Sequence, residues 1–160
     1  ETKEVKKIEE FVIVVDTSMS CSGDLVRRFL EETYHVLCQS DSYFKKTNIH
    51  IIQCDDQVQQ DRKITCRQEM EEYMKDFSII GQGGTDFRPV FRYVKEQQEK
   101  KEIRSLKALI YFTDGDGIYP GSKPDYETAF VFLHKTEKME LVPPWAIRLV
   151  AEQEGGRYRT

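Results

Sequence analysis

The chain has 160 residues, which suits one domain with its own core and is too short for two comfortable domains. Hydrophobic residues make up 39% and charged residues 32%, as is typical of a soluble globular protein, and the formal net charge of -4 argues against a nucleic-acid-binding surface. The longest apolar run is far shorter than the roughly 18 residues that cross a bilayer, so we expect no membrane span.

The four cysteines show neither a C-x-x-C pair nor a spacing typical of zinc sites; they are Cys21, Cys38, Cys54 and Cys66. We therefore predict reduced thiols in a cytoplasmic protein rather than a disulfide framework. There is no signal peptide, and because the chain begins at Glu1 rather than Met we expect an excised domain whose targeting information lies elsewhere.

The first part of the chain predicts a strand followed by a helix. Residues 1–7 are polar and predict a lead-in or linker, so the domain should occupy residues 8–160. From Ile8 to Val15 the sequence becomes continuously apolar and β-branched, which indicates a strand covered on both faces. A helix should start near Gly23, and its apolar stripe consists of Val26, Phe29, Leu30, Thr33 and Leu37.

A second strand, a hairpin and a second helix are expected next. Residues 39–47 read as a polar connection and 48–54 as a buried strand, which the turn at Asp55-Asp56-Gln57 ends. Residues 58–65 alternate weakly and predict a short edge strand that returns antiparallel. Residues 66–77 should form a helix whose methionines and aromatic residues belong to the core.

The glycine-rich segment 81–86 breaks the chain before another helix, whose apolar face comes from Val90, Phe91 and Val94. Strands are predicted at 106–112 and 129–133, while 145–151 fits either helix or strand, and the polar tail should end in a short strand. Strands alternating with helices predict an α/β fold, a Rossmann-like three-layer sandwich with a mostly parallel central sheet and one antiparallel edge strand.

Oxygen-bearing side chains occupy three loops at predicted strand ends or helix starts. The stretch after the first strand contains Asp16, Ser18 and Ser20, the glycine-rich loop contains Thr85, and Asp114 follows the strand at 106–112. Ligands of parallel α/β sheets bind at the carboxyl ends of the strands. Because hard oxygen ligands suit Mg²⁺ and similar cations, we expect these loops to form one metal site.

This set resembles the metal-ion-dependent adhesion site (MIDAS) of von Willebrand factor A (VWA) domains, whose pattern is D-x-S-x-S, then Thr, then Asp. The resemblance covers roughly residues 8–150, and Met19 departs from the Gly often found between the two serines. A closer resemblance is to a bacterial subgroup of VWA-like proteins, in which this module is the C-terminal half and follows a metallopeptidase-like half. The segments that carry this resemblance are residues 83–91, 111–115 and 143–145. No H-E-x-x-H motif occurs in this chain.

The resemblance implies a non-enzymatic, metal-dependent protein-interaction module. Ser18, Ser20 and Thr85 would contact Mg²⁺ (or Mn²⁺ or Ca²⁺) directly, while Asp16 and Asp114 would contribute charge through bound waters. The expected partner presents a carboxylate to the cation. It could be a MoxR-type AAA+ ATPase or an upstream metallopeptidase-like domain of the same polypeptide, with neither nucleic acid nor membrane involved.

Two alternatives stay open at the level of sequence. The same residues could be plain helix caps and turns, which would leave a metal-free scaffold. They could also form a metal-dependent hydrolase or phosphatase, with Asp16 as nucleophile and Asp114 and Asp116 as metal ligands. A serine where a second acid is expected after Asp16, and the lack of a lysine near a strand end, argue against that enzyme. Asp86 and Asp116 are expected to be loop or cap residues.

Overall fold

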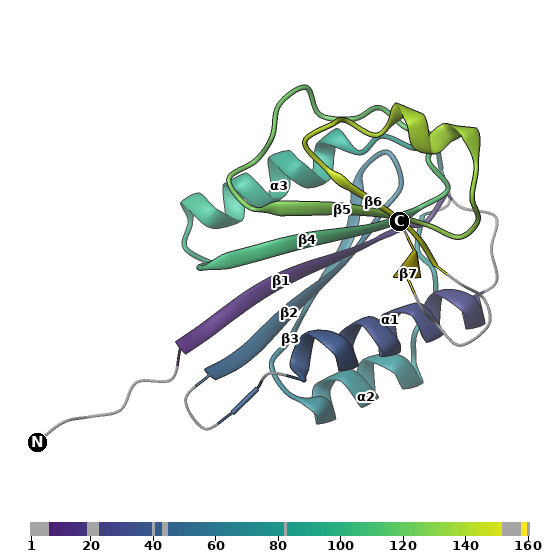
Figure 1. Ribbon diagram of the computed structural model, residues 1–160. Helices are drawn as coiled ribbons and strands as arrows, with labels where there is room; N and C mark the ends of the chain where they lie inside the picture. Colours follow the sequence, from purple (N-terminus) through teal and green to yellow (C-terminus); the bar gives the residue numbers. More distant parts are fainter. Residues whose placement is uncertain are drawn as a thin grey trace, which may run out of the picture.

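A seven-stranded sheet forms the middle of the molecule, as the computed structural model shows in Figure 1. The structure describes residues 7–18, 23–39, 41–42, 45–81, 83–151 and, for the backbone, 158–159. The strands are β1 (Lys7–Asp16), β2 (Lys45–Cys54), β3 (Val58–Ile64), β4 (Leu106–Thr113), β5 (Glu127–Phe132), β6 (Ile147–Ala151) and β7 (Tyr158–Arg159). The helices are α1 (Gly23–Cys38), α2 (Arg67–Lys75), α3 (Arg88–Glu99) and the short 3-10 helix η1 (Glu137–Leu141).

The strands lie in the order β3-β2-β1-β4-β5-β6-β7. The five central strands are parallel, and β3 and β7 pair antiparallel at the two edges. The α/β sandwich with a mostly parallel sheet is thereby confirmed, including the antiparallel hairpin after the second strand. The two-residue β7 adds a second antiparallel strand at the opposite edge.

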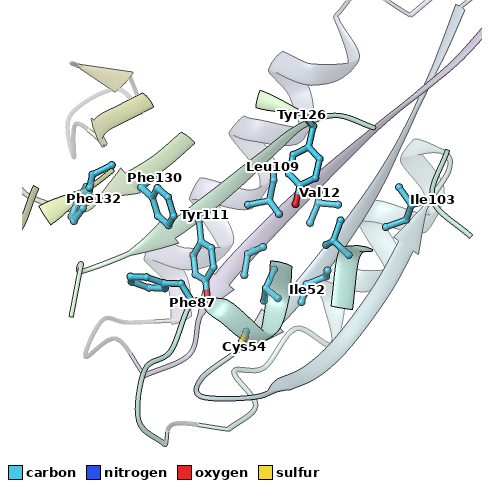
Figure 2. Packing of buried hydrophobic residues seen from close by; sticks show 14 of the residues in the cluster. Val12, Ile52, Cys54, Phe87, Ile103, Leu109, Tyr111, Tyr126, Phe130 and Phe132 are labelled. Atoms are coloured by element: carbon cyan, nitrogen blue, oxygen red, sulfur yellow. The ribbon is translucent and has the colours of Figure 1, made fainter. Parts of the chain in front are cut away.

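Helices cover both faces of the sheet: α1 and α2 lie on one side and α3 on the other (Figure 1). Strand β1 runs through the centre, where the side chains from Val12 to Val15 are fully buried on alternating faces. The α3 side holds an aromatic cluster that includes Phe87, Tyr111 and Phe130 (Figure 2). The other side packs Phe29 of α1 in a stacked arrangement, 3.9 Å between ring centroids, on Phe112 of β4.

The structure differs from expectation where the sequence lacks clear periodicity. Strand β2 begins at Lys45 rather than at residue 48, because its first residues continue the parallel register with β1. Residues 147–151 are strand, which resolves the ambiguity in that segment. The helix η1 was not expected; the Thr136 hydroxyl accepts a hydrogen bond from the Lys138 N–H at its start.

Two further expectations can be compared with the described residues. Cys38, Cys54 and Cys66 are free thiols, whereas Cys21 lies outside the residues that the structure describes. No helix among those residues has the length and apolar character that a membrane crossing requires.

Candidate metal centre

The candidate centre lies at the carboxyl ends of the two central strands. Asp16 is the last residue of β1, and Asp114 directly follows β4. These neighbours mark the point where the strand order reverses, since β2 lies on one side of β1 and β4 on the other. Such a switch point leaves a crevice in which open α/β sheets bind ligands. The position that the sequence predicted for the site is therefore the one that the topology favours.

Asp16 is a buried carboxylate, 1% exposed, and both of its oxygens have hydrogen-bond partners. The Ser18 N–H donates to Oδ1 over 3.0 Å and the Ser18 hydroxyl contacts the same oxygen, while the Thr113 hydroxyl donates to Oδ2 over 2.6 Å. Burial raises the pKa of Asp16, and so does the nearby charge of Asp114, whereas the bonds from Ser18 and Thr113 lower it less. A cation beside this carboxylate would relieve the cost of its burial.

Ser18 joins the first loop to the glycine-rich loop. Its hydroxyl contacts the Thr85 hydroxyl as well as Oδ1 of Asp16, so three oxygens from two distant parts of the chain meet at one point. Asp114 is half-buried, close enough to raise the pKa of Asp16, and its Oδ1 accepts the Asp116 N–H over 3.3 Å. The predicted ligand Ser20 lies outside the described residues.

The glycine-rich loop that carries Thr85 is held by Asp55, a residue whose role the sequence did not reveal. Asp55 is 4% exposed, and its Oδ2 accepts the Gly83 N–H over 3.0 Å. Its Oδ1 accepts the Gln57 N–H and the Gln59 side-chain amide, each over 3.0 Å. Burial opposes the ionised form, but these three bonds outweigh it and lower the pKa of Asp55. Asp55 is thus a charged anchor for the segment that precedes Thr85.

Backbone bonds connect the loops around the centre. The Thr17 N–H donates to the Cys54 carbonyl over 2.9 Å, which joins the ends of β1 and β2. The Asp86 N–H donates to the Asp55 carbonyl over 3.3 Å. The Phe87 N–H donates to the Ile118 carbonyl over 3.1 Å, so the Thr85 segment is also tied to the loop that follows Asp114.

Close packing fixes Thr85 from the other side. The ring of Phe87, fully buried two residues after Thr85, lies 4.9 Å from Tyr111 and 5.5 Å from Phe130 between ring centroids (Figure 2). A Cβ on Gly117 would lie 2.7 Å from the Phe87 ring and 2.8 Å from the Thr85 methyl group. Only glycine therefore allows the loop after β4 to approach Thr85 this closely.

The donor set fits a hard divalent cation. Hydroxyl and carboxylate oxygens are the ligands that Mg²⁺ prefers. Over the described part of the chain, no group of three or more His, Cys, Asp or Glu side chains could hold a metal ion. In the same residues, neither Asp16 nor Asp114 forms an ion pair with Lys or Arg.

One argument against the hydrolase alternative is wrong. The expectation that no lysine lies near a strand end fails at Lys138, whose Nζ is 2.7 Å from Asp116 Oδ2 and whose pKa the charges of Asp116 and Asp114 raise. The sequence missed Lys138 because η1 was not foreseen. The burial of Asp16 and the hydrogen bonds to both of its oxygens argue against its use as a nucleophile instead.

Two other acids lie where the sequence placed them. Asp86 accepts the Arg88 N–H over 3.0 Å and pairs with the Arg88 guanidinium, so it is a loop residue that directly precedes Phe87, the N-cap of α3. Asp116 is an exposed loop residue paired with Lys138.

The family model of the VWA-like domain (DUF2201) matches residues 11–152 of this chain. Among curated proteins, no sequence matches it.

Solved structures of several other proteins share the fold. The conserved hypothetical protein BatB from Bacteroides thetaiotaomicron is 13% identical, with 94% of this chain and 75% of that chain covered and a TM-score of 0.57. Proximal thread matrix protein 1 from the mussel byssus, solved with a zinc-occupied MIDAS motif, is 12% identical over 91% of this chain and 45% of its own, with a TM-score of 0.58. The SpRpn10 VWA domain is 12% identical over 91% and 90%, with a TM-score of 0.53. Such low identities establish a common fold alone.

Proposed function

The chain belongs to the family of VWA-like domains (DUF2201), and from this premise we propose that it is a protein-interaction module that binds a divalent cation and, through it, an acidic side chain of a partner. The observation that carries the proposal is the contact of the Ser18 hydroxyl with both Asp16 and Thr85. This contact brings together the first two parts of the D-x-S-x-S, Thr, Asp pattern. Asp114, the third part, is near enough for its charge to raise the pKa of Asp16.

The residues divide into two kinds of donor. Ser18 and Thr85 offer neutral hydroxyls, and Ser20 belongs with them by the sequence pattern. Asp16 and Asp114 supply negative charge. A divalent cation bound by neutral oxygens and water would stay electrophilic enough to accept a carboxylate oxygen from a partner. Mg²⁺ is the ion we propose, with Mn²⁺ or Ca²⁺ as substitutes. The zinc-occupied MIDAS motif of the mussel protein supports a divalent ion at such a site.

Binding rather than catalysis is the chemistry that this arrangement favours. Asp16 contacts the hydroxyl pair through Ser18, and both of its oxygens accept hydrogen bonds. Activated nucleophiles need an adjacent base within hydrogen-bond reach and room for the substrate. VWA-like domains commonly mediate protein–protein contacts, and the proposed partners are a MoxR-type AAA+ ATPase or a metallopeptidase-like domain of the same polypeptide.

Thermal melting with and without Mg²⁺ tests the proposal. At a Mg²⁺ concentration about 100 times the dissociation constant, binding to the native state alone stabilises it by about 2.7 kcal/mol. For a domain of this size that raises Tm by about 5–10 °C. Thr85→Val, which keeps the shape but removes the hydroxyl, should abolish this shift, whereas Thr85→Ser should retain most of it. An equal Mg²⁺ shift in both variants would contradict the proposal, and phosphatase turnover that is lost in Asp16→Asn would favour the hydrolase.

A further inference from the structure

A groove of about 480 Å³ lies between α3 and the loop that leads into β5. In Figure 1 this loop, drawn in green, passes beside α3 on the face opposite α1 and α2. The helix contributes Arg88, Phe91, Arg92, Lys95 and Gln98 to the lining. The loop contributes the segment from Pro120 to Tyr126.

The groove is positively charged although the whole chain is acidic. Arg92, Lys95 and Lys123 line it with exposed side chains, against one lining carboxylate, Asp125. The guanidinium of Arg88 already pairs with Asp86, and Lys123 lies 3.9 Å from Glu127, near the upper limit for an ion pair. Within the described residues, Arg92 and Lys95 form no ion pair. In the part of the chain that the structure describes, the charge of Arg92 reaches Asp86, whose pKa it lowers, but neither Arg92 nor Lys95 has a carboxylate within salt-bridge distance.

Both walls of the groove start at the candidate metal centre. Helix α3 begins at Arg88, three residues after Thr85, and the loop begins at Asp114. The bond from the Phe87 N–H to the Ile118 carbonyl holds the two walls together at the end nearest the centre. The side chain of Ile118 is 51% exposed there, an unusual place for a large apolar group. Arg88, at the start of α3, lines the groove, so one end of the groove lies close along the chain to the segment that carries Thr85.

We infer that this groove receives the rest of the partner segment whose carboxylate binds the metal, and that this segment is an extended, acidic peptide. The inference rests on the proposed function of the metal centre. From Arg88 to Gln98 the helix rises about 15 Å, which corresponds to about five residues of extended chain. Acidic side chains on that stretch would pair with Arg92, Lys95 and Lys123, and one apolar side chain next to the metal-bound acid would cover Ile118.

Selection from a library of random displayed peptides tests this surface without a known partner. The chain is used as it stands, in millimolar Mg²⁺ and in EDTA, and the same selection is repeated on Arg92→Glu/Lys95→Glu. The matched control, Arg28→Glu/Lys75→Glu, makes the same change in net charge on the exposed faces of α1 and α2. A neutral pair, Arg92→Gln/Lys95→Gln, keeps the test valid if the charge reversal impairs folding.

We expect the selected peptides to bind only in Mg²⁺. Each should contain one acidic residue whose replacement abolishes binding, and further acidic residues within about five positions of it. Arg92→Glu/Lys95→Glu should bind them about tenfold more weakly and select basic residues at those positions, while the control behaves like wild type. Mg²⁺-dependent peptides with no acidic excess, unchanged by the charge reversal, would overturn the inference and leave the metal site intact. Binding of an oligonucleotide that needs Arg92 and Lys95, without acidic peptides, would also overturn it. A selection that does not depend on Mg²⁺ would reject the proposed function itself.

Discussion

Replacement of Asp55 by Asn should weaken both the fold and the metal centre. The carboxylate accepts three N–H groups, from Gln57, Gln59 and Gly83. An Asn has one acceptor oxygen, so its amide group would face at least one of these donors and leave it unsatisfied. Hydrogen bonds to a charged group contribute about 1.5–3 kcal/mol, and an unsatisfied buried donor costs about 1–3 kcal/mol. We expect a loss of about 2 kcal/mol in the free energy of unfolding and a fall of about 4–8 °C in Tm.

The effect on the metal centre follows from the position of Gly83, two residues before Thr85. Loss of the Gly83 bond frees the segment that places the Thr85 hydroxyl beside Ser18. Residues that orient metal ligands typically change metal affinity by about 10–100-fold, so Mg²⁺ binding measured by calorimetry should weaken by at least about tenfold. Asp56→Asn is the matched control, because Asp56 is the exposed neighbour and the charge change is the same. Equal Mg²⁺ affinity in Asp55→Asn and Asp56→Asn would show that Asp55 does not position Thr85.

Three other perturbations have defined outcomes. Burial opposes ionisation of Asp61, but its hydrogen bonds with His50 and Tyr93 outweigh that cost and lower its pKa. The ionised Asp61 therefore stabilises the fold above pH about 4, and this stabilisation is lost as the pH falls through the lowered pKa. The free energy of unfolding in urea should depend less on pH between about pH 2 and 5 in Asp61→Asn than in the wild type, and an equal pH dependence would contradict this. Gly115 has φ +91°, and a Cβ there would lie 2.4 Å from the Phe132 ring, so Gly115→Ala should lower the free energy of unfolding by about 2–4 kcal/mol. Gly121→Ala, where a Cβ would meet no atom within 4 Å, should lower it by less than about 1 kcal/mol. Similar decreases for both variants in thermal or urea unfolding would be inconsistent with this packing. Gly117→Ala should push the Phe87 ring and Thr85 apart at a cost of about 1–3 kcal/mol and reduce the Mg²⁺-dependent rise in Tm, which a full Mg²⁺ response would disprove.

The sequence could predict the elements whose signal is local. The continuous apolar run that ends at Asp16 needs cover on both faces wherever it lies, and helix α1 shows a regular apolar stripe, so both were predictable within a residue or two. The edge strand β3 was also predictable, because the short turn after β2 can only return the chain beside it. The closeness of Ser18 and Thr85 followed from the strand-end rule combined with the resemblance.

The parts that the sequence could not predict depend on contacts between distant segments. Asp55 stands in a sequence typical of an ordinary hairpin turn, and its hydrogen bond with Gly83 joins residues 28 positions apart in the chain. One signal was available: Asp55 follows a parallel strand next to β1, at the same edge of the sheet as Asp16. Lys138 gave no such signal, because η1 lies in a stretch without helical periodicity and its approach to Asp116 depends on the fold of two loops.

A crystal structure of the chain grown with Mn²⁺, with the ion located by its anomalous scattering, would show whether Ser18 and Thr85 bind a metal together. We expect one strong peak bonded to the hydroxyl oxygens of Ser18 and Thr85, with Asp16 and Asp114 around it. The peak should be absent in crystals of Thr85→Val grown in the same way. No peak between Ser18 and Thr85 in the wild-type crystals, or a peak bound elsewhere with these two hydroxyls bonded only to each other, would contradict it.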